Sequence, residues 1–182
     1  MGAYQLWFER TVSQVTPVRL FMQTSWGWPA IESVHFLGLT LLFGSIVVWD
    51  LRLLGMAGGV PISAFHRLVP FAVLGFAINI VSGSMFVMAE ANQYVYNPAF
   101  QFKLLFLALA GVNVLVFYVT MFRRVAALGP GAAAPRGVRV SGALSLVFWA
   151  AVIICGRLIT FYRPTVCTPG RAIGFIADCI IR

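Results

Sequence analysis

Four apolar stretches, each long enough to cross a lipid bilayer, constrain this sequence more than any other feature. A helix needs about 20 mostly apolar residues to cross a hydrocarbon core of roughly 30 Å. Short connections favour antiparallel neighbours, so the sequence predicts an all-α integral membrane protein, an up-down four-transmembrane-helix bundle. The predicted spans extend from about Ala30 to Leu54, from about Arg67 to Ala91, from Phe102 to Phe122 and from Ser141 to Tyr162.

Composition argues against the main soluble classes. The 182 residues are 60% hydrophobic and only 10% charged, whereas a soluble domain carries roughly 25% charged residues. A net charge of +8 would suggest nucleic acid in a soluble chain. Here the arginines flank apolar stretches, as membrane anchoring requires. We therefore expect the lipid bilayer as a partner and no nucleic acid.

The two ends of the chain differ from residues 25–162, which form the predicted four-helix transmembrane domain. Residues 1–24 are aromatic and amphipathic and are interrupted near Pro17, which predicts an interfacial helix lying on the membrane. Residues 163–182 form a short extramembrane C-terminal tail. In this tail Cys167 and Cys179 are candidates for a disulfide outside the cell.

The distribution of basic residues predicts the orientation in the membrane. The first and third connections, with the adjoining helix ends, carry six arginines, while the second carries a single lysine at its edge. Because cytoplasmic loops are enriched in Lys and Arg, the first and third connections are expected inside the cell and both termini outside it. The residues are Arg52, Arg67, Arg123, Arg124, Arg136 and Arg139 on one side and Lys103 on the other.

Counting depth along the predicted helices divides most ionisable residues into two layers, at about 1.5 Å of rise per residue. No ionisable residue is expected between the layers. The outer layer holds Glu32, His35, Glu90, Lys103 and Arg157, with Met85 and Met88 at a similar depth. The inner layer holds Asp50, Arg52, His66, Arg67, Arg123 and Arg124.

The charged residues of the outer layer have a structural interpretation. An ionisable group at the centre of a span costs at least about 2.5–3.5 kcal/mol, so such groups persist when they are paired, solvated or functional. Glu32, Glu90, Lys103 and Arg157 carry opposite charges and would form a salt-bridged polar layer near the headgroups.

His35 is the residue that this interpretation explains least. It would serve as an axial ligand of haem b, with Met85 at a similar depth as a possible second ligand. It would alternatively bind copper or another metal together with Met85, Met88 or Glu32, the last being on the same helix face. A third alternative is an ordinary hydrogen-bonded histidine.

His66 is expected near the opposite membrane face, beside Arg67. About 18 residues of helix, on the order of 27 Å, would separate it from His35. One haem iron therefore does not bridge the two histidines, and His66 is interpreted as an interfacial residue.

Several motifs resemble an uncharacterised family of small bacterial four-helix membrane proteins. They are Pro29-Ala-Ile-Glu-Ser-Val-His35-Phe-Leu-Gly38, Asp50-Leu-Arg-Leu-Leu-Gly55, Asn97-Pro-Ala-Phe-Gln-Phe-Lys103, Ala110-Gly-Val-Asn113 and Gly156-Arg157-Leu-Ile. The resemblance covers roughly residues 25 to 162. It implies the bacterial inner (cytoplasmic) membrane and no established activity.

A more distant resemblance concerns His35 and Lys103 only. A histidine early in the first helix and a lysine opening the third are similar to the CopD-type copper-resistance proteins. The same pair resembles the HemJ-type membrane protoporphyrinogen oxidases, which bind haem b. These resemblances imply haem b or, alternatively, copper.

The sequence therefore yields three functional hypotheses. The leading one is a haem-b-binding membrane subunit for electron transfer, with His35 as ligand and with Lys103 and Arg157 beside the haem propionates. The second is copper or metal handling. The third is a non-catalytic accessory or scaffold subunit. In each case the small extramembrane mass predicts other membrane-protein subunits or a homo-oligomer as partners.

Overall fold

The structure is a computed structural model that describes residues 3–14, 16–128, 131–166 and 179–180. Within these residues the fold is all-α, without a β-strand, and Val166 and Ile180 form an isolated bridge. Four helical segments are long and apolar enough to cross a membrane: Gly27–Leu53, Ile62–Ala89, Pro98–Thr120 and Arg136–Leu158. This confirms the predicted fold class.

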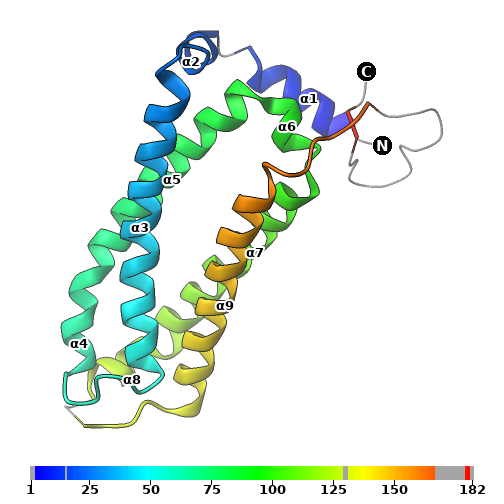
Figure 1. Ribbon diagram of the computed structural model, residues 1–182. Helices are drawn as coiled ribbons and strands as arrows, with labels where there is room; N and C mark the ends of the chain where they lie inside the picture. The colour runs from blue at the N-terminus through cyan, green and yellow to red at the C-terminus, as the bar shows by residue number, and fades with distance from the viewer. Residues whose placement is uncertain (1–2, 15, 129–130, 167–178, 181–182) are drawn as a thin grey trace. The chain divides into compact units, whose positions relative to one another are not determined.

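The helices follow one another along the chain with short connections (Figure 1). In order they are α1 (Ala3–Val12), α2 (Thr16–Met22), α3 (Gly27–Leu53), α4 (Ile62–Phe65), the 3₁₀ turn η1 (His66–Leu68), α5 (Val69–Ala89), α6 (Ala91–Val95), α7 (Pro98–Thr120), α8 (Phe122–Ala126) and α9 (Arg136–Leu158).

The spanning helices leave much of their apolar surface uncovered. Val73 and Leu74 on α5 and Leu115 and Val119 on α7 are among many exposed large side chains. Only 11% of an 18-residue apolar stretch of α7 is buried, against 39% of the corresponding stretch of α9. Apolar surface of this extent requires lipid rather than water around it. The protein is a multi-pass membrane protein in contact with the bilayer.

The helix boundaries differ from the predicted ones by a few residues, for local reasons. The first span begins at Gly27 and ends at Leu53, because Gly55 has a φ of 109°, a conformation that terminates helices. The second span includes the short α4 and η1 and therefore begins earlier than predicted. It ends at Ala89, where the backbone of Glu90 turns to φ −133° and ψ 56°.

Asn97 forms hydrogen bonds at the nearby ends of two spans. Its Oδ1 accepts a hydrogen bond from the backbone N–H of Ala99 at 3.0 Å, so it caps α7 and this helix begins at Pro98 rather than Phe102. Its Nδ2 donates to the carbonyl oxygens of Ile159 and Tyr162, both at 3.1 Å. These carbonyls follow α9, which ends at Leu158 rather than at Tyr162. Gln93 Nε2 donates to the same two oxygens, at 2.9 and 2.7 Å.

The chain divides into two compact units, to each of which all four spanning segments contribute. Unit 1 comprises residues 1–36, 79–104 and 153–182, and unit 2 comprises residues 37–78 and 105–152. The two units are described separately below.

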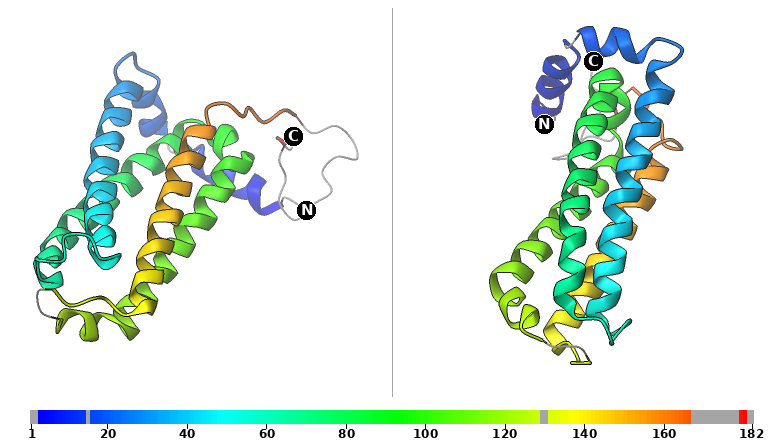
Figure 2. Two further views of the ribbon diagram at one scale, coloured as in Figure 1. Left: turned by 60° about the horizontal axis from the view of Figure 1, so that its bottom comes forward. Right: turned by 90° about the vertical axis from the view of Figure 1, so that its left-hand side faces the viewer.

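In unit 1 the N-terminal helix packs on α6 (Figure 2). Gln5 Nε2 donates to the carbonyl oxygen of Val95 at 3.2 Å, and Tyr96 Oη donates to Glu9 Oε2 at 3.0 Å. The polar face of α1 thus points to the protein, while Trp7 on the other face is 68% exposed. An outward aromatic face is suited to a membrane interface, and the predicted interfacial location stays a prediction.

In unit 2 the backbones of α3 and α5 approach closely. A Cβ atom added at Gly75 would lie 2.5 Å from Leu42 N and 2.6 Å from Gly38 O. Small residues such as Gly38 and Gly75 allow such contacts between spanning helices. Gly44, also on α3, has nothing within 4 Å of an added Cβ.

A reciprocal pair of hydrogen bonds joins α7 and α9 in unit 2. Asn113 Nδ2 donates to the backbone oxygen of Ser141 at 3.0 Å, and Ser141 Oγ donates to Asn113 Oδ1 at 3.1 Å. Arg52, which is 2% exposed, donates from Nε to Val60 O at 2.8 Å. This side chain stabilises the connection between α3 and α4 from inside.

Candidate functional site

The two predicted layers fall into different units. Every residue of the outer layer belongs to unit 1 and every residue of the inner layer to unit 2. Unit 1 contains Glu32 and His35 on α3, Met85 and Met88 on α5, Glu90 before α6, Lys103 on α7 and Arg157 on α9. Unit 2 contains Asp50 and Arg52 on α3, His66 and Arg67 in η1, and Arg123 and Arg124 on α8.

His35 is half-buried and held against α5 by a hydrogen bond. Its Nδ1 atom lies 2.8 Å from Oγ of Ser82, a side chain that is itself buried. Nε2 has no hydrogen-bond partner in the part of the chain that the structure describes. When Nδ1 carries the proton and donates it to Ser82, the lone pair of Nε2 is free to bind a ligand.

Two further residues of α5 set the orientation of the imidazole. The ring of Phe86 meets it edge to face, with centroids 5.6 Å apart. Gly83 lies against the ring edge, because a Cβ added there would be 3.7 Å from Cε1 of His35. A methyl group at Gly83 would therefore be in van der Waals contact with the imidazole.

The two methionines are half-buried on the same helix as Ser82. Met85 packs against a small core of Met22, Phe86 and Ala89. Packing alone explains its position, and its role as a second haem ligand stays a prediction. No group of three His, Cys, Asp or Glu side chains with the geometry of a metal site occurs among the described residues.

The expected salt-bridged layer does not form among the residues that the structure describes. Glu32, Glu90 and Arg157 are exposed, and none of them has an ion pair within the described ranges of the chain. Arg157 instead lies over the ring of Phe161, 5.1 Å from its centroid. Long side chains at helix ends extend to the headgroup region, where water and lipid solvate the charge.

Among the described cations of unit 1, Lys103 is the one that points inward. It is half-buried, and its Nζ would lie 3.6 Å from a Cβ added at Gly156 on α9. The absence of a side chain at Gly156 leaves the space that the lysine occupies. The two residues on which the distant resemblance depends, His35 and Lys103, thus belong to the same unit.

Tyr94, on the short α6 outside the spans, lies near both acidic residues of the layer. Burial, with the charges of Glu32 and Glu90, raises the pKa of Tyr94 to about 12. The hydroxyl group therefore stays protonated over the physiological range.

His66 in unit 2 lies among aromatic rings. Its location at the membrane interface stays a prediction. Its centroid is 4.9 Å from that of Phe122 and 5.9 Å from that of Trp49. Its Nε2 lies 3.4 Å from the hydroxyl of Tyr118. Arg67 beside it is exposed.

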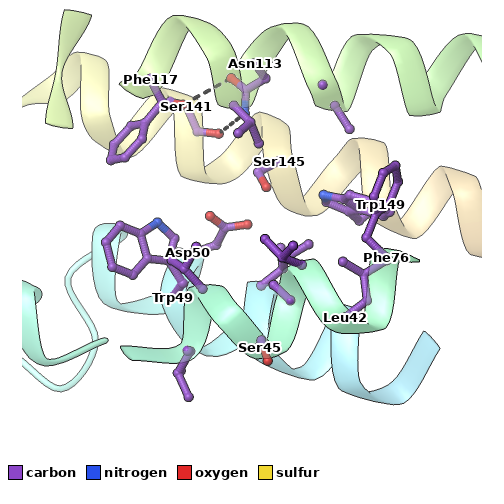
Figure 3. Close-up of a pocket in the computed structure, with 18 of the residues that line it drawn as sticks. Leu42, Ser45, Trp49, Asp50, Phe76, Asn113, Phe117, Ser141, Ser145 and Trp149 are labelled. Carbon is purple, nitrogen blue, oxygen red and sulfur yellow. Dashed lines mark hydrogen bonds between the residues drawn. The ribbon is translucent and has the colours of Figure 1, made fainter. Parts of the chain in front are cut away.

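Asp50 was predicted only as a member of the inner layer, but it lies in a cavity of unit 2. The side chain is 3% exposed, and its Oδ2 has no hydrogen-bond partner in the described structure. The cavity has a volume of about 280 Å³. Figure 3 shows the carboxyl group of Asp50 and the hydroxyl group of Ser145, on α9, pointing toward one another, and both residues line the cavity.

Sequence reasoning missed Ser82 and Trp149. Ser82 and Ser84 flank Gly83 and are alike in sequence, yet Ser82 is buried and Ser84 is exposed. Only the rotation of α5 about its axis distinguishes them. Trp149 resembles any other aromatic residue of a span, and no signal in the sequence marks its buried Nε1, which also has no hydrogen-bond partner in the described structure.

The predicted disulfide involves Cys167, which lies outside the described residues. Comparisons with protein-family models, with curated proteins and with solved structures found no match to this chain.

Proposed function

We propose that this protein is a haem-b-binding integral membrane subunit that takes part in electron transfer, with His35 as an axial ligand through Nε2. The observation that carries the proposal is the hydrogen bond of 2.8 Å between His35 Nδ1 and Ser82 Oγ, with Nε2 left unpartnered in the described structure. Ligating histidines are commonly held in this way through the second ring nitrogen. Bound haem would supply a one-electron iron couple.

The cations of unit 1 support the proposal. Lys103 and Arg157 lie on α7 and α9, and neither is neutralised by an acidic side chain within the described residues. Unpaired cations near an imidazole ligand are suited to bind carboxylates such as haem propionates. Lys103 would hold one propionate from inside, and Arg157 would bind the other at the exposed edge.

A partner is part of the proposal. His35 is only half-buried, and the chain has little mass outside its spans. We propose that another membrane subunit or a second copy covers this side of unit 1. The proposed location is the bacterial inner membrane, with both termini on the periplasmic side.

The test is an absorption spectrum of protein gently solubilised after haem-replete expression. A Soret band should be present in the native chain and lost in His35→Ala. His66→Ala is the matched control, because His66 is the second of the two histidines in the chain and lies in unit 2. This variant should keep the band.

Metal analysis of the same samples tests the alternatives. Bound copper without a Soret band, lost in His35→Ala, would replace haem by copper handling through His35, Met85, Met88 or Glu32. Absence of both haem and copper, with normal membrane assembly of His35→Ala, would favour the scaffold hypothesis.

A further inference from the structure

Two buried polar atoms in unit 2 have no hydrogen-bond partner in the described structure: Oδ2 of Asp50 and Nε1 of Trp149. Oδ2 of an ionised Asp50 accepts hydrogen bonds, and Nε1 of Trp149 donates one. Native structures leave few buried polar groups unsatisfied, because each costs about 1–3 kcal/mol. Both residues line the same cavity, so a molecule in that cavity would be able to satisfy both.

The cavity has the size and the walls of a site for an aromatic ring. Its volume is about 280 Å³, and an apolar cavity of roughly 150 Å³ already holds benzene. Helices α3 and α5 form one side and α7 and α9 the other (Figure 3). The walls are mostly apolar, and Trp49, Phe76 and Phe117 contribute aromatic surface.

Three other polar side chains of the wall, Ser45, Asn113 and Ser141, already have hydrogen-bond partners. Ser45 donates to Leu41 O at 2.7 Å, and Ser141 is paired with Asn113. The buried atoms of this wall that have no partner in the described structure are Oδ2 of Asp50 and Nε1 of Trp149. In the view of Figure 3 the carboxyl group of Asp50 lies between the rings of Trp49 and Phe117 on one side and the indole of Trp149 on the other.

Access to the cavity is from the lipid side. Val73 and Phe76 on α5 and Val114 and Tyr118 on α7 line the cavity and are also exposed. These helices are spans whose outer surface meets the bilayer. A ligand that enters here has to be soluble in the membrane.

From these observations we infer that the cavity of unit 2 binds a membrane-soluble hydroquinone, a single ring with oxygen atoms at opposite ends. One hydroxyl group donates to Oδ2 of Asp50, and the other oxygen accepts the N–H of Trp149. An acyl chain of a lipid fills the volume but satisfies neither group. The site is separate from His35, and its test involves no haem, so the two proposals stand or fall independently.

The test measures the binding of two probes to the protein in lipid nanodiscs. The probes have the same aromatic ring and the same four methyl groups. Tetramethylhydroquinone carries the two hydroxyl groups, and tetramethylbenzene lacks them. The signal is the emission of Trp49 and Trp149 in a background with Trp7, Trp26 and Trp28 replaced by Phe. Both probes should give a saturable change, with the hydroquinone bound more tightly.

Asp50→Leu and Trp149→Phe each remove one hydrogen-bonding group. Each should weaken tetramethylhydroquinone binding about tenfold and leave tetramethylbenzene binding unchanged, which also shows that the cavity is intact. Asp50→Asn should give a smaller loss in the same direction. Ser45→Ala is the matched control, because its hydroxyl group is already bonded to Leu41, and it should bind both probes as the parent does.

Two results would overturn the inference. One is the absence of saturable hydroquinone binding in the parent protein. The other is an equal change for both probes in Asp50→Leu and in Trp149→Phe, since the hydroxyl groups would then contribute nothing to recognition.

Discussion

Gly75 on α5 faces Gly38 on α3 at a distance that leaves no room for a methyl group. A Cβ added at Gly75 would lie 2.6 Å from the carbonyl oxygen of Gly38, and backbone atoms do not move aside as a flexible side chain would. In unit 2 this contact brings the two helices together. Its position along both helices decides which other side chains meet.

Gly75→Ala should therefore destabilise the protein by about 1–3 kcal/mol, the usual cost of overpacking. Gly44→Ala is the control, since nothing lies within 4 Å of its added Cβ, and it should be neutral or slightly stabilising. Thermal unfolding in detergent measures both variants. Equal stability of the two would contradict the close approach.

Ser82→Ala should weaken haem binding about tenfold if the proposed function holds, because the imidazole of His35 loses the group that fixes it. Ser82→Thr keeps a hydroxyl group and should restore most of the affinity. Ser84→Ala is the control, since Ser84 is exposed and its Oγ donates to Ile80 O. Haem titration of the apo-protein gives the dissociation constants. A normal value for Ser82→Ala would argue against a positioning role.

The pair Asn113 and Ser141 should show coupling in a double-mutant cycle. Hydrogen bonds between spanning helices average about 0.6 kcal/mol and reach about 1.7 kcal/mol. Asn113→Ala, Ser141→Ala and the double variant, compared by reversible unfolding, should give a coupling energy in this range. Strictly additive losses would mean that the Oγ–Oδ1 hydrogen bond contributes nothing.

Asn97→Ala should loosen the C-terminal end of α9 and the start of α7 together. It removes the N-cap of α7 and leaves two carbonyl oxygens with fewer donors, at a cost of about 1–3 kcal/mol. Hydrogen exchange should accelerate in the first turn of α7 and around Ile159. Gln23→Ala, an exposed amide on the N-terminal side, should change neither region. Acceleration confined to one of the two helices would refute the double role.

Arg52→Lys should release the connection between α3 and α4. The guanidinium group donates to Val60 O and, at 3.4 Å, to Gly58 O, and a lysine cannot reproduce this fork geometry. Limited proteolysis should cut residues 54–61 faster. Arg67→Lys, a change at an exposed arginine, should leave the cleavage rate unchanged.

Much of the fold is predictable from local sequence, and the deviations have local causes. The number of spans follows from apolar length alone. The fourth span ends at Leu158 rather than at Tyr162, and the carbonyl oxygens beyond that end accept hydrogen bonds from Gln93 and Asn97, which are distant in sequence. A pattern read along one helix does not contain that information.

The candidate site was predicted unevenly. His35 and Lys103 were selected by their rarity, and unit 1 contains both. The four opposite charges were expected to pair, but three of them are exposed. The position of a residue along its helix gives the depth of its charge in the membrane. A salt bridge between two charges at one depth also requires that the two side chains face each other around their helix axes.

The sequence by itself determined that this chain crosses a membrane four times, because the hydrocarbon core requires long apolar helices whose backbone hydrogen bonds are internal. It also determined which few polar residues are available for chemistry. Only the tertiary structure decided that Ser82 meets His35 and that Asp50 and Trp149 share a cavity. Those relationships depend on the rotation and close approach of neighbouring helices, which small residues such as Gly75 permit and which no single helix encodes.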